Sequence, residues 1–262
     1  MRILRSIAVA FAQYSRIPVP RFEWREEDMT YSLSAFPLVG AVTAALFCAA
    51  FMLCRRFALP DTAAALLLTA VPLLVTGGFH ADGFMDVADA LSSYRTKEEK
   101  LAILKDPHIG AFAVIRLAIC GLIFIASLIT LIASNEPQDL IICTAACFVL
   151  ARSLSAVSVL TFRSARNEGM LYYEAASAAK GRSVNLTFSF LWAALASAVM
   201  IYYGKTAGIA GIAAAVLSFL WYKYKSYKEF GGITGDTAGY FVVICETAAA
   251  AAAALAAVLT AA

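Results

Sequence analysis

The sequence predicts an all-α membrane protein, a polytopic helix bundle with about seven transmembrane spans. Hydrophobic residues make up 61% of its 262 residues and charged residues 15%, whereas a soluble domain has about 45–50% and 25%. The apolar residues gather in long stretches: Ile109–Ala133 contains one charge, Arg116, and Val184–Tyr203 contains none. A helix needs about 20 apolar residues to cross a bilayer. These observations exclude a disordered chain and a disulfide-rich secreted module, and they argue against a soluble globular enzyme.

The first segment, Met1–Gln13, contains Arg2, Arg5 and an apolar run that is too short to span a membrane. It lacks the small-residue cleavage site of a signal peptide. We therefore expect an amphipathic helix that lies at the membrane interface.

Seven apolar stretches follow, and they predict one integral membrane domain over residues 1–262. Pro72 and Gly77-Gly78 interrupt the second stretch, and Gly208 and Gly211 interrupt the sixth, so the ends of these two are the hardest to place. The predicted spans are Leu33–Leu53, Asp61–Phe79, Ile109–Ala133, Leu140–Phe162, Val184–Tyr203, Thr206–Tyr222 and Thr237–Leu259.

Lysine and arginine are distributed among the loops in a pattern that orients a membrane protein. Of the 21 basic residues, 16 precede the first span or lie in the second-to-third, fourth-to-fifth and sixth-to-seventh connections, and three lie in the other connections. Short loops rich in lysine and arginine stay in the cytoplasm. The pattern predicts seven spans, a cytoplasmic N-terminus and an external C-terminus.

Composition also restricts the partners. The net charge is +3, and no basic stripe with interleaved aromatic residues occurs, so we expect no nucleic-acid partner. The six cysteines lie in apolar stretches without a Cys-x-x-Cys pair, which is typical of buried free thiols. Membrane lipid is the expected surrounding, and the sequence leaves open whether the chain forms a homo-oligomer.

The densest polar cluster follows the second span and contains Asp82, Asp86 and Asp89. In a helix, Asp86 and Asp89 would lie within about 40° of Asp82, so the three carboxylates would share one narrow face. Like charges at this spacing repel, and no lysine or arginine between Arg56 and Arg95 balances them. Because hard oxygen ligands suit Mg²⁺, we predict metal or phosphate chemistry here rather than a solvated acidic helix end.

His80 precedes this cluster and would point about 160° away from Asp82 in the same helix. It would reach the carboxylates only if Gly77 and Gly78 broke or unwound the helix. The sequence therefore leaves two roles open for His80, a buried or capping side chain and a catalytic one.

A second polar feature, Lys105-Asp106-Pro107-His108, comes directly before the third span. Asp106 fits a helix stop, with Pro107 in the first turn of the next helix. In the functional interpretation, Asp106 is a further metal ligand, and Lys105 or His108 contacts phosphate.

The seventh span opens with Gly231-Gly-Ile-Thr234-Gly235-Asp236-Thr237. On the predicted topology this helix N-terminus faces the same side as the aspartates, where its free N–H groups and dipole favour an anion. The segment is neither a P-loop nor a dinucleotide fingerprint. In the loop after the fourth span, Arg163 and Arg166 either clamp phosphate or simply mark the cytoplasmic side.

Two charges, Arg152 and Glu246, fall inside predicted spans. Each lies nine or ten residues from the cytoplasmic end of its span, about 14–15 Å deep at about 1.5 Å per residue. An isolated charge at that depth costs several kcal/mol, so we predict that the two side chains pair or share a polar cavity.

Five segments occur along the chain in a characteristic order. They are Arg16-Ile-Pro-Val-Pro20, Phe36-Pro-Leu-Val-Gly40, Thr76-Gly-Gly-Phe-His80-x-Asp82-Gly-x-x-Asp86-x-x-Asp89, Ile103-Leu-Lys-Asp106-x-x-Ile-Gly110 and Gly231-Gly-x-Thr-Gly-Asp236-Thr. In these segments the chain resembles the cobalamin synthase family (adenosylcobinamide-GDP ribazoletransferases), and the resemblance runs from about residue 10 to Glu246. His108 departs from the family pattern, because arginine is common there, and this affects one expected phosphate contact. Ala90 and Leu171 replace glycines.

The resemblance implies a bacterial inner-membrane enzyme that joins GDP-activated adenosylcobinamide to α-ribazole or its 5′-phosphate, releases GMP and uses Mg²⁺. Together with the features above, it predicts catalytic roles for His80, Asp82 and Asp86. The predicted metal ligands are Asp82, Asp86, Asp89 and Asp106. The predicted substrate- or phosphate-binding residues are Gly77, Gly78, Lys105, Arg152, Arg166, Thr234, Gly235, Asp236, Thr237 and Glu246.

Two alternatives use the same carboxylates. A CDP-alcohol phosphotransferase also binds Mg²⁺ through aspartates at helical spacing, but its motif ends in a Gly-x-x-x-Asp-x-x-x-Asp arrangement that is absent here. A cation-coupled transporter would carry polar residues across the membrane and often contains inverted repeats. The polar motifs of this chain instead gather at one predicted face.

Overall fold

The structure, a computed structural model, describes residues 2–20 and 23–261. Within these ranges the regular structure is helical apart from one isolated bridge between Ser164 and Ile233, so the all-α prediction is confirmed. Met1, part of the predicted N-terminal helix, and Arg21, part of the basic-residue count, lie outside the described residues.

The N-terminal helix α1 (Arg2–Tyr14) is 13 residues long, which confirms the predicted short helix. It packs against α2 and against a 3₁₀ turn, η1 (Glu26–Met29). Arg5 joins α1 to this turn through a 3.0 Å ion pair with Asp28, whose side chain is buried.

All seven predicted spans are helical. Six helices in the described residues are long and apolar enough to cross a membrane, and the number becomes seven if the bent pair α3–α4 counts as one crossing. The helices that match the predicted spans are α2 (Ser32–Arg56), α3 (Asp61–Thr76), α6 (Ala111–Ile132), α7 (Pro137–Thr161), α9 (Arg182–Gly204), α10 (Thr206–Phe230) and α11 (Gly235–Ala261).

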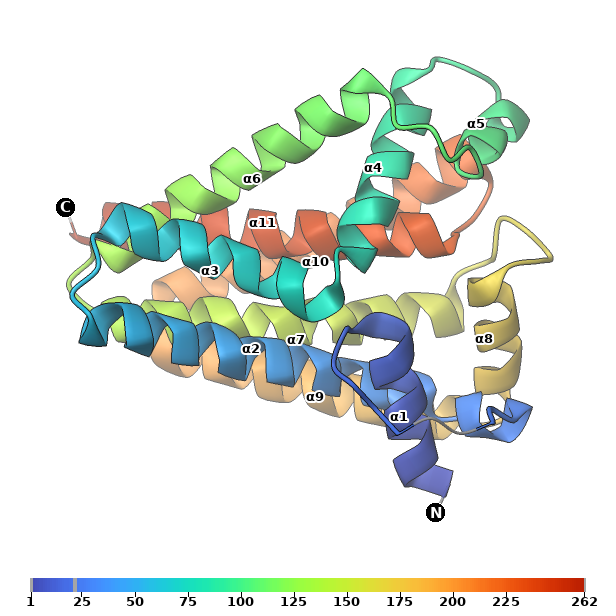
Figure 1. The fold of residues 1–262 in the computed structure, drawn as a ribbon, viewed down its shortest axis with the longest axis horizontal. Helices are drawn as coiled ribbons and strands as arrows, with labels where there is room; N and C mark the ends of the chain where they lie inside the picture. Colours follow the sequence, from blue (N-terminus) through green and yellow to red (C-terminus); the bar gives the residue numbers. More distant parts are fainter. Residues whose placement is uncertain (1, 21–22, 262) are drawn as a thin grey trace.

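The second predicted span ends in a sharp bend. Between α3 and α4 (Phe79–Ser92) lie Gly77 and Gly78, both in the left-handed region with φ of +63° and +80°. Residues with a Cβ avoid this conformation, so the paired glycines let the chain turn by 95°. α4 therefore leaves the bundle axis and lies across one end of the bundle (Figure 1).

The sixth predicted span is one continuous helix of 25 residues, α10, and it runs eight residues past the predicted end at Tyr222. Its glycines do not interrupt it. A Cβ on Gly208 would collide with the backbone of Met200 on α9, and a Cβ on Gly211 would come within 3.3 Å of the Ala249 carbonyl oxygen on α11. These glycines allow close helix packing, as small residues do between membrane helices.

α7 is the central helix of the bundle. It packs against α2, α9 and α11, and 89% of the residues in its most apolar stretch are buried. The surrounding helices leave large apolar side chains exposed, among them Leu74, Leu122 and Leu217. An apolar outer surface of this kind is typical of helices that face lipid.

The short helices gather at one end of the bundle, which we call the α4 end (Figure 1). α1, α4, α5 (Lys97–Ile103) and α8 (Met170–Ala179) lie there, whereas the C-terminus lies at the opposite end. Termini at opposite ends require an odd number of crossings, which agrees with the seven predicted spans. The loops rich in lysine and arginine are those of the α4 end.

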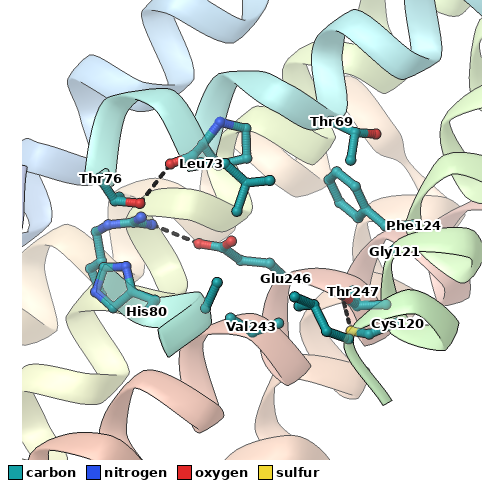
Figure 2. A pocket seen from close by; sticks show the side chains of 14 residues that line it. Thr69, Leu73, Thr76, His80, Cys120, Gly121, Phe124, Val243, Glu246 and Thr247 are labelled. Carbon is teal, nitrogen blue, oxygen red and sulfur yellow. Dashed lines mark hydrogen bonds and ion pairs between the residues drawn. The ribbon is translucent and has the colours of Figure 1, made fainter. Parts of the chain in front are cut away.

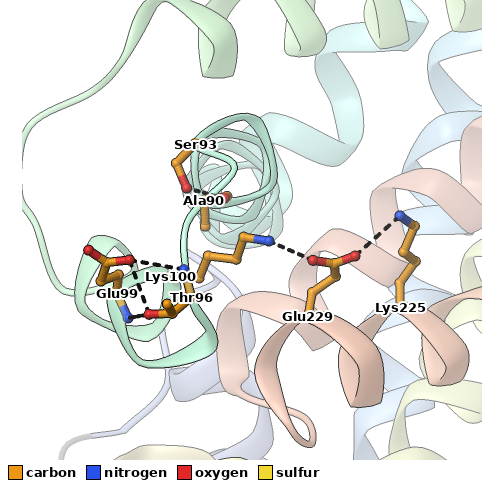
Figure 3. A network of polar contacts seen from close by, with 7 residues as sticks. All are labelled: Ala90, Ser93, Thr96, Glu99, Lys100, Lys225 and Glu229. Atoms are coloured by element: carbon orange, nitrogen blue, oxygen red, sulfur yellow. Dashed lines mark hydrogen bonds and ion pairs between the residues drawn. The ribbon is translucent and has the colours of Figure 1, made fainter.

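A polar network attaches α5 to α10 (Figure 3). α5 begins with a capping box, in which the Thr96 hydroxyl accepts the Glu99 N–H and the Glu99 carboxylate accepts the Thr96 N–H. Lys100 is buried, and its Nζ donates to Glu229 Oε2 of α10 at 2.6 Å. Lys225 contacts the other Glu229 oxygen at 3.6 Å. The network holds the loop before α6 against the bundle.

Candidate functional site

Three carboxylates lie within electrostatic reach of one another where α4 packs against the first turn of α11. Asp82 and Asp86 lie on α4, and Asp236 lies on α11. Gly83 makes this packing close, because a Cβ there would lie 2.9 Å from the Asp236 Cα and carbonyl oxygen. The helical spacing of Asp82 and Asp86 is as predicted. The addition of Asp236 depends on the contact between the two helices.

Replacing Gly83 by alanine is expected to separate α4 from α11 and to lower both stability and activity. The added methyl group would meet backbone atoms of Asp236, which cannot rotate away, and overpacking of this kind costs about 1–3 kcal/mol. Thermal unfolding of the detergent-solubilised variant measures the effect. Gly121→Ala is the matched control, because a Cβ on Gly121 meets no atom within 4 Å. Equal unfolding temperatures for the two variants would contradict the prediction.

The carboxylates of α4 make the site strongly negative. Partial burial, together with the charges of Asp82, Asp236 and Asp89, raises the pKa of Asp86 to about 6. Neither Asp82 nor Asp86 forms an ion pair with another described residue. Arg166 supplies some opposing charge to Asp236, and a cation or a cationic substrate group can supply the rest.

Asp89, the third carboxylate of the predicted face, contacts the start of α6. Its Oδ2 accepts the Gly110 N–H at 2.5 Å and its Oδ1 accepts the Ala113 N–H at 2.8 Å. These N–H groups lie in the first turn of α6, where no partner within the helix is available. The Asp89 carboxylate thus holds the N-terminus of α6 beside α4, and both of its oxygens are engaged.

The polar side chains of the segment before α6 make contacts of their own. Asp106 accepts hydrogen bonds from the backbone N–H of His108 at 3.0 Å and pairs with His108 Nδ1 at 2.6 Å, and its side chain is 53% exposed. These contacts lower the pKa of Asp106, chiefly through the His108 N–H. Lys105 forms a 2.6 Å ion pair with Glu168. The structure therefore does not place Asp106 beside Asp82 and Asp86.

The N-terminus of α11 is closed by two threonines. The Thr234 N–H donates to Thr237 Oγ1 at 2.8 Å, and the Thr237 N–H donates to Thr234 Oγ1 at 3.2 Å. This reciprocal cap engages the hydroxyl of Thr237, which is buried. Gly235 is exposed at the mouth of the helix, and its position leaves room for a ligand because a Cβ there meets no atom within 4 Å.

A cavity of about 260 Å³, which we call the Arg166 cavity, opens beside this helix end. It contains positive, negative and hydroxyl groups, and Arg166 is anchored in it by a hydrogen bond to the Leu101 carbonyl oxygen. Asp82 forms part of its wall. The polar residues that line it are Asp82, Ser164, Arg166, Glu168, Tyr172, Thr234 and Asp236.

A second cavity of about 640 Å³, which we call the Arg16 cavity, lies on the other side of Asp82. α1, the segment after it and the α3–α4 bend form its walls. Asp82 and Phe79 line both cavities, so a single carboxylate separates two spaces. The polar residues that line the second cavity are Gln13, Ser15, Arg16, Thr76 and Asp82, together with Gly77 and Gly78.

His80 lines a third cavity, a mostly apolar space of about 100 Å³ between the helices (Figure 2). Its ring is buried, and no described residue forms a hydrogen bond with its Nε2. His80 lines neither the Arg166 cavity nor the Arg16 cavity. Because α4 is helical from Phe79 onward, His80 points away from Asp82, which agrees with the orientation expected in a continuous helix.

Arg152 and Glu246 line the same internal cavity and form an ion pair, as predicted. Arg152 Nη1 donates to Glu246 Oε1 at 2.7 Å and to the Phe148 carbonyl oxygen at 2.9 Å. Arg152 is fully buried, and its Nε has no partner among the described residues. The pair thus joins α7 to α11 in the interior of the bundle, apart from the three carboxylates.

The carboxylates of α4 can supply part of the coordination shell of a hard cation. No three His, Cys, Asp or Glu side chains in the described part of the chain lie close enough to form a metal site by themselves. Mg²⁺ commonly takes only one or two protein carboxylates and completes its shell with waters and substrate phosphates. Asp82 and Asp86 offer such a pair of unpaired carboxylates next to two cavities.

Sequence reasoning did not select Arg16 or Gln13 as site residues. Arg16 entered only as a basic residue of the N-terminal segment and as the start of a family segment. Their position depends on α1 folding back against the α3–α4 bend, where the Arg16 N–H donates to the Val75 carbonyl oxygen at 2.8 Å. Another buried carboxylate, Glu174, was also missed; it accepts a 2.5 Å hydrogen bond from the Tyr14 hydroxyl.

Comparison with known proteins gives a consistent result. Residues 6–254 match the model of a family described as cobalamin-5-phosphate synthase. A protein of Lachnoclostridium phytofermentans named adenosylcobinamide-GDP ribazoletransferase is 39% identical over 94% of this chain and 92% of its own length. Proteins of the same name from Desulfitobacterium hafniense and Clostridium perfringens are 32% and 30% identical and are also covered over more than nine-tenths of their lengths. No solved structure matches the chain.

Proposed function

The chain belongs to the cobalamin-5-phosphate synthase family, and from this premise we propose how it acts as an adenosylcobinamide-GDP ribazoletransferase. The reaction transfers the cobinamide phosphoryl group from GDP-activated adenosylcobinamide to a ribose hydroxyl of α-ribazole or α-ribazole 5′-phosphate. GMP leaves. One observation supports the assignment of the site above all others: Asp82 lies between two cavities. A residue that acts on two substrates needs access to both of their binding sites.

The donor's pyrophosphate is proposed to occupy the Arg166 cavity. Arg166 and the first residues of α11 line this space, and a guanidinium and a helix N-terminus both favour phosphate oxygens. The open position at Gly235 lets a phosphate approach the backbone. Lys105, paired with Glu168 at the rim, adds positive charge near the entrance.

Asp82 and Asp86 are the residues proposed to hold Mg²⁺, with Asp236 beside them. The cation, when bound, neutralises the pyrophosphate oxygens and stabilises GMP as a leaving group. Asp89 contributes by fixing α4 to the start of α6 through its two hydrogen bonds. Asp106 lies at the exposed loop with His108, and its role as a ligand would require that loop to move toward α4.

The acceptor is proposed to bind in the Arg16 cavity, with its reacting hydroxyl directed toward Asp82. A carboxylate of the cluster then accepts the hydroxyl proton, since general bases must lie within hydrogen-bond reach of the proton they take. His80 lines neither substrate cavity. We therefore propose that His80, with Arg152 and Glu246, supports the site from inside the bundle.

The membrane and the orientation follow the distribution of basic residues. We propose a bacterial inner-membrane location, with the α4 end and its two cavities facing the cytoplasm, because most lysines and arginines lie in the loops of that end. The exposed apolar side chains of the long helices would face lipid.

Release of GMP from GDP-activated adenosylcobinamide, in the presence of α-ribazole or its 5′-phosphate, tests this function. Purified protein in detergent or in liposomes is expected to form GMP and the cobalamin product together, and only when Mg²⁺ is present. GMP release without an acceptor, or product formation that chelation of Mg²⁺ leaves unchanged, would contradict the proposed site. Turnover of CDP-alcohol substrates instead would favour the alternative phosphotransferase.

A further inference from the structure

The Arg16 cavity has the size and the mixed lining of a site for a small ligand. Its volume is about 640 Å³, within the range of about 300–1,000 Å³ that is usual for such sites. The Arg166 cavity, at about 260 Å³, is large enough for phosphate groups but small for a whole nucleotide. The Arg16 cavity is therefore the larger of the two spaces beside Asp82, and its volume suits a small ligand such as the proposed acceptor.

Arg16 is a cation without a partner in this cavity. Its side chain is exposed, and no described residue forms an ion pair with it or accepts a hydrogen bond from its guanidinium. Other arginines of the α4 end are engaged: Arg163 donates to the Gly231 carbonyl oxygen and Arg166 to that of Leu101. Asp82 lines the same cavity and still forms no ion pair with Arg16. The guanidinium is thus available to an anionic ligand.

The backbone of Arg16 is anchored to the end of α3. Its backbone N–H donates to the Val75 carbonyl oxygen at the end of α3. Its side-chain stem lies over Gly77, where a Cβ would come within 2.9 Å of Arg16 Cδ. The left-handed conformation of Gly77 (φ +63°) forms the bend that creates α4, and this bend also brings the Arg16 side chain to the cavity.

We propose that Arg16 binds the 5′-phosphate of the acceptor and makes the enzyme selective for α-ribazole 5′-phosphate over free α-ribazole. The planar guanidinium matches a phosphate in a two-pronged geometry. The acceptor carries a reacting hydroxyl and a phosphate that does not react, and the Arg16 cavity offers one partner for each: Asp82 and Arg16. This inference rests on the proposed function and names the group that the second cavity recognises.

Arg16→Met tests the proposal, because methionine keeps an unbranched stem over Gly77 and removes the charge. With saturating donor, the KM for α-ribazole 5′-phosphate is expected to rise about 10- to 100-fold, the loss typical of a charge-assisted hydrogen bond, while the KM for free α-ribazole stays unchanged. The KM of Arg16→Lys for α-ribazole 5′-phosphate is expected to lie between those of Arg16→Met and the wild type, because lysine keeps the charge but cannot form the two parallel hydrogen bonds of a guanidinium. Arg95→Met is the matched control: Arg95 is exposed at the same end and lines neither cavity.

Three outcomes would overturn the proposal. They are an equal effect on both acceptors, a rise confined to the KM for the donor, and no effect at all. Calorimetric titration of the detergent-solubilised protein with α-ribazole 5′-phosphate gives a second measurement that needs no turnover. If the wild-type protein forms no product, the proposed function fails, but the affinity ratio between wild type and Arg16→Met still decides the role of Arg16. Absence of binding by the wild type would also overturn it.

Discussion

Replacing Asp82 by asparagine is expected to lower transferase activity by about two orders of magnitude or more while leaving the fold intact. The asparagine keeps the size of the side chain and removes the charge that a cation would contact. Asp82 is exposed and has no ion pair within the described chain, so no structural contact is lost. Removing one of several repelling carboxylates should, if anything, stabilise the protein. Turnover and thermal unfolding, measured on the same preparation, check both parts.

Asp61→Asn is the matched control for this variant. Asp61 is an exposed carboxylate at the start of α3, at the opposite end of the bundle, and forms a 3.4 Å ion pair with Arg55. Exposed pairs contribute little to stability, so activity and unfolding should match the wild type. Activity of Asp82→Asn within a few-fold of the wild type would contradict a role for Asp82 at the reacting phosphate. A large loss of stability would show instead that Asp82 maintains the fold.

Glu246→Leu is expected to destabilise the bundle by about 3–5 kcal/mol, the effect of removing one partner from a buried ion pair. Arg152 is fully buried, and its Nη1 would keep only the Phe148 carbonyl oxygen as a partner. The charge of an arginine persists at any accessible pH, so the variant cannot adapt by losing a proton. Unfolding of the detergent-solubilised protein with increasing denaturant or temperature measures the loss.

The double variant Arg152→Met with Glu246→Leu distinguishes two causes of the expected destabilisation, the unpaired charge of Arg152 and the packing lost with Glu246. Replacing both partners by apolar side chains of similar volume is often neutral or stabilising, so the double variant should recover most of the lost stability. If the double variant is as unstable as Glu246→Leu, the pair does not explain the effect. Activity of a stable double variant then shows whether the internal cavity also contributes to substrate binding.

Much of this architecture was predictable because membrane spans are local features. Each span needs a run of apolar residues of a certain length, so the long apolar helices, six in the described residues or seven with the bent pair α3–α4, appeared in the sequence. The alternation of basic loops agreed with termini at opposite ends. The spacing of Asp82 and Asp86 followed from helix geometry alone. The orientation of His80 away from Asp82 followed from the same geometry, once α4 proved to be helical from Phe79.

Other parts of the site could not be predicted, because they depend on contacts between distant segments. Asp89 and Asp106 carry the same chemical group as Asp82, but Asp89 binds the backbone of α6 and Asp106 pairs with His108. Gly208 and Gly211 looked like interruptions of a span and proved to be packing positions. In each case, the same residue type can play several structural roles, and the segment that packs against it determines which role it has.

The sequence by itself determined the class of the protein, the positions of its long apolar helices and the family to which its motifs belong, because hydrophobic length and motif spacing are properties of short segments. Only the tertiary structure decided which charges meet. The bend at Gly77-Gly78 turns α4 across the bundle end, Gly83 brings Asp236 to Asp82, and α1 returns Arg16 to the same place. Charges are scarce in this chain because the membrane excludes them, so the packing that brings these few together also defines the site.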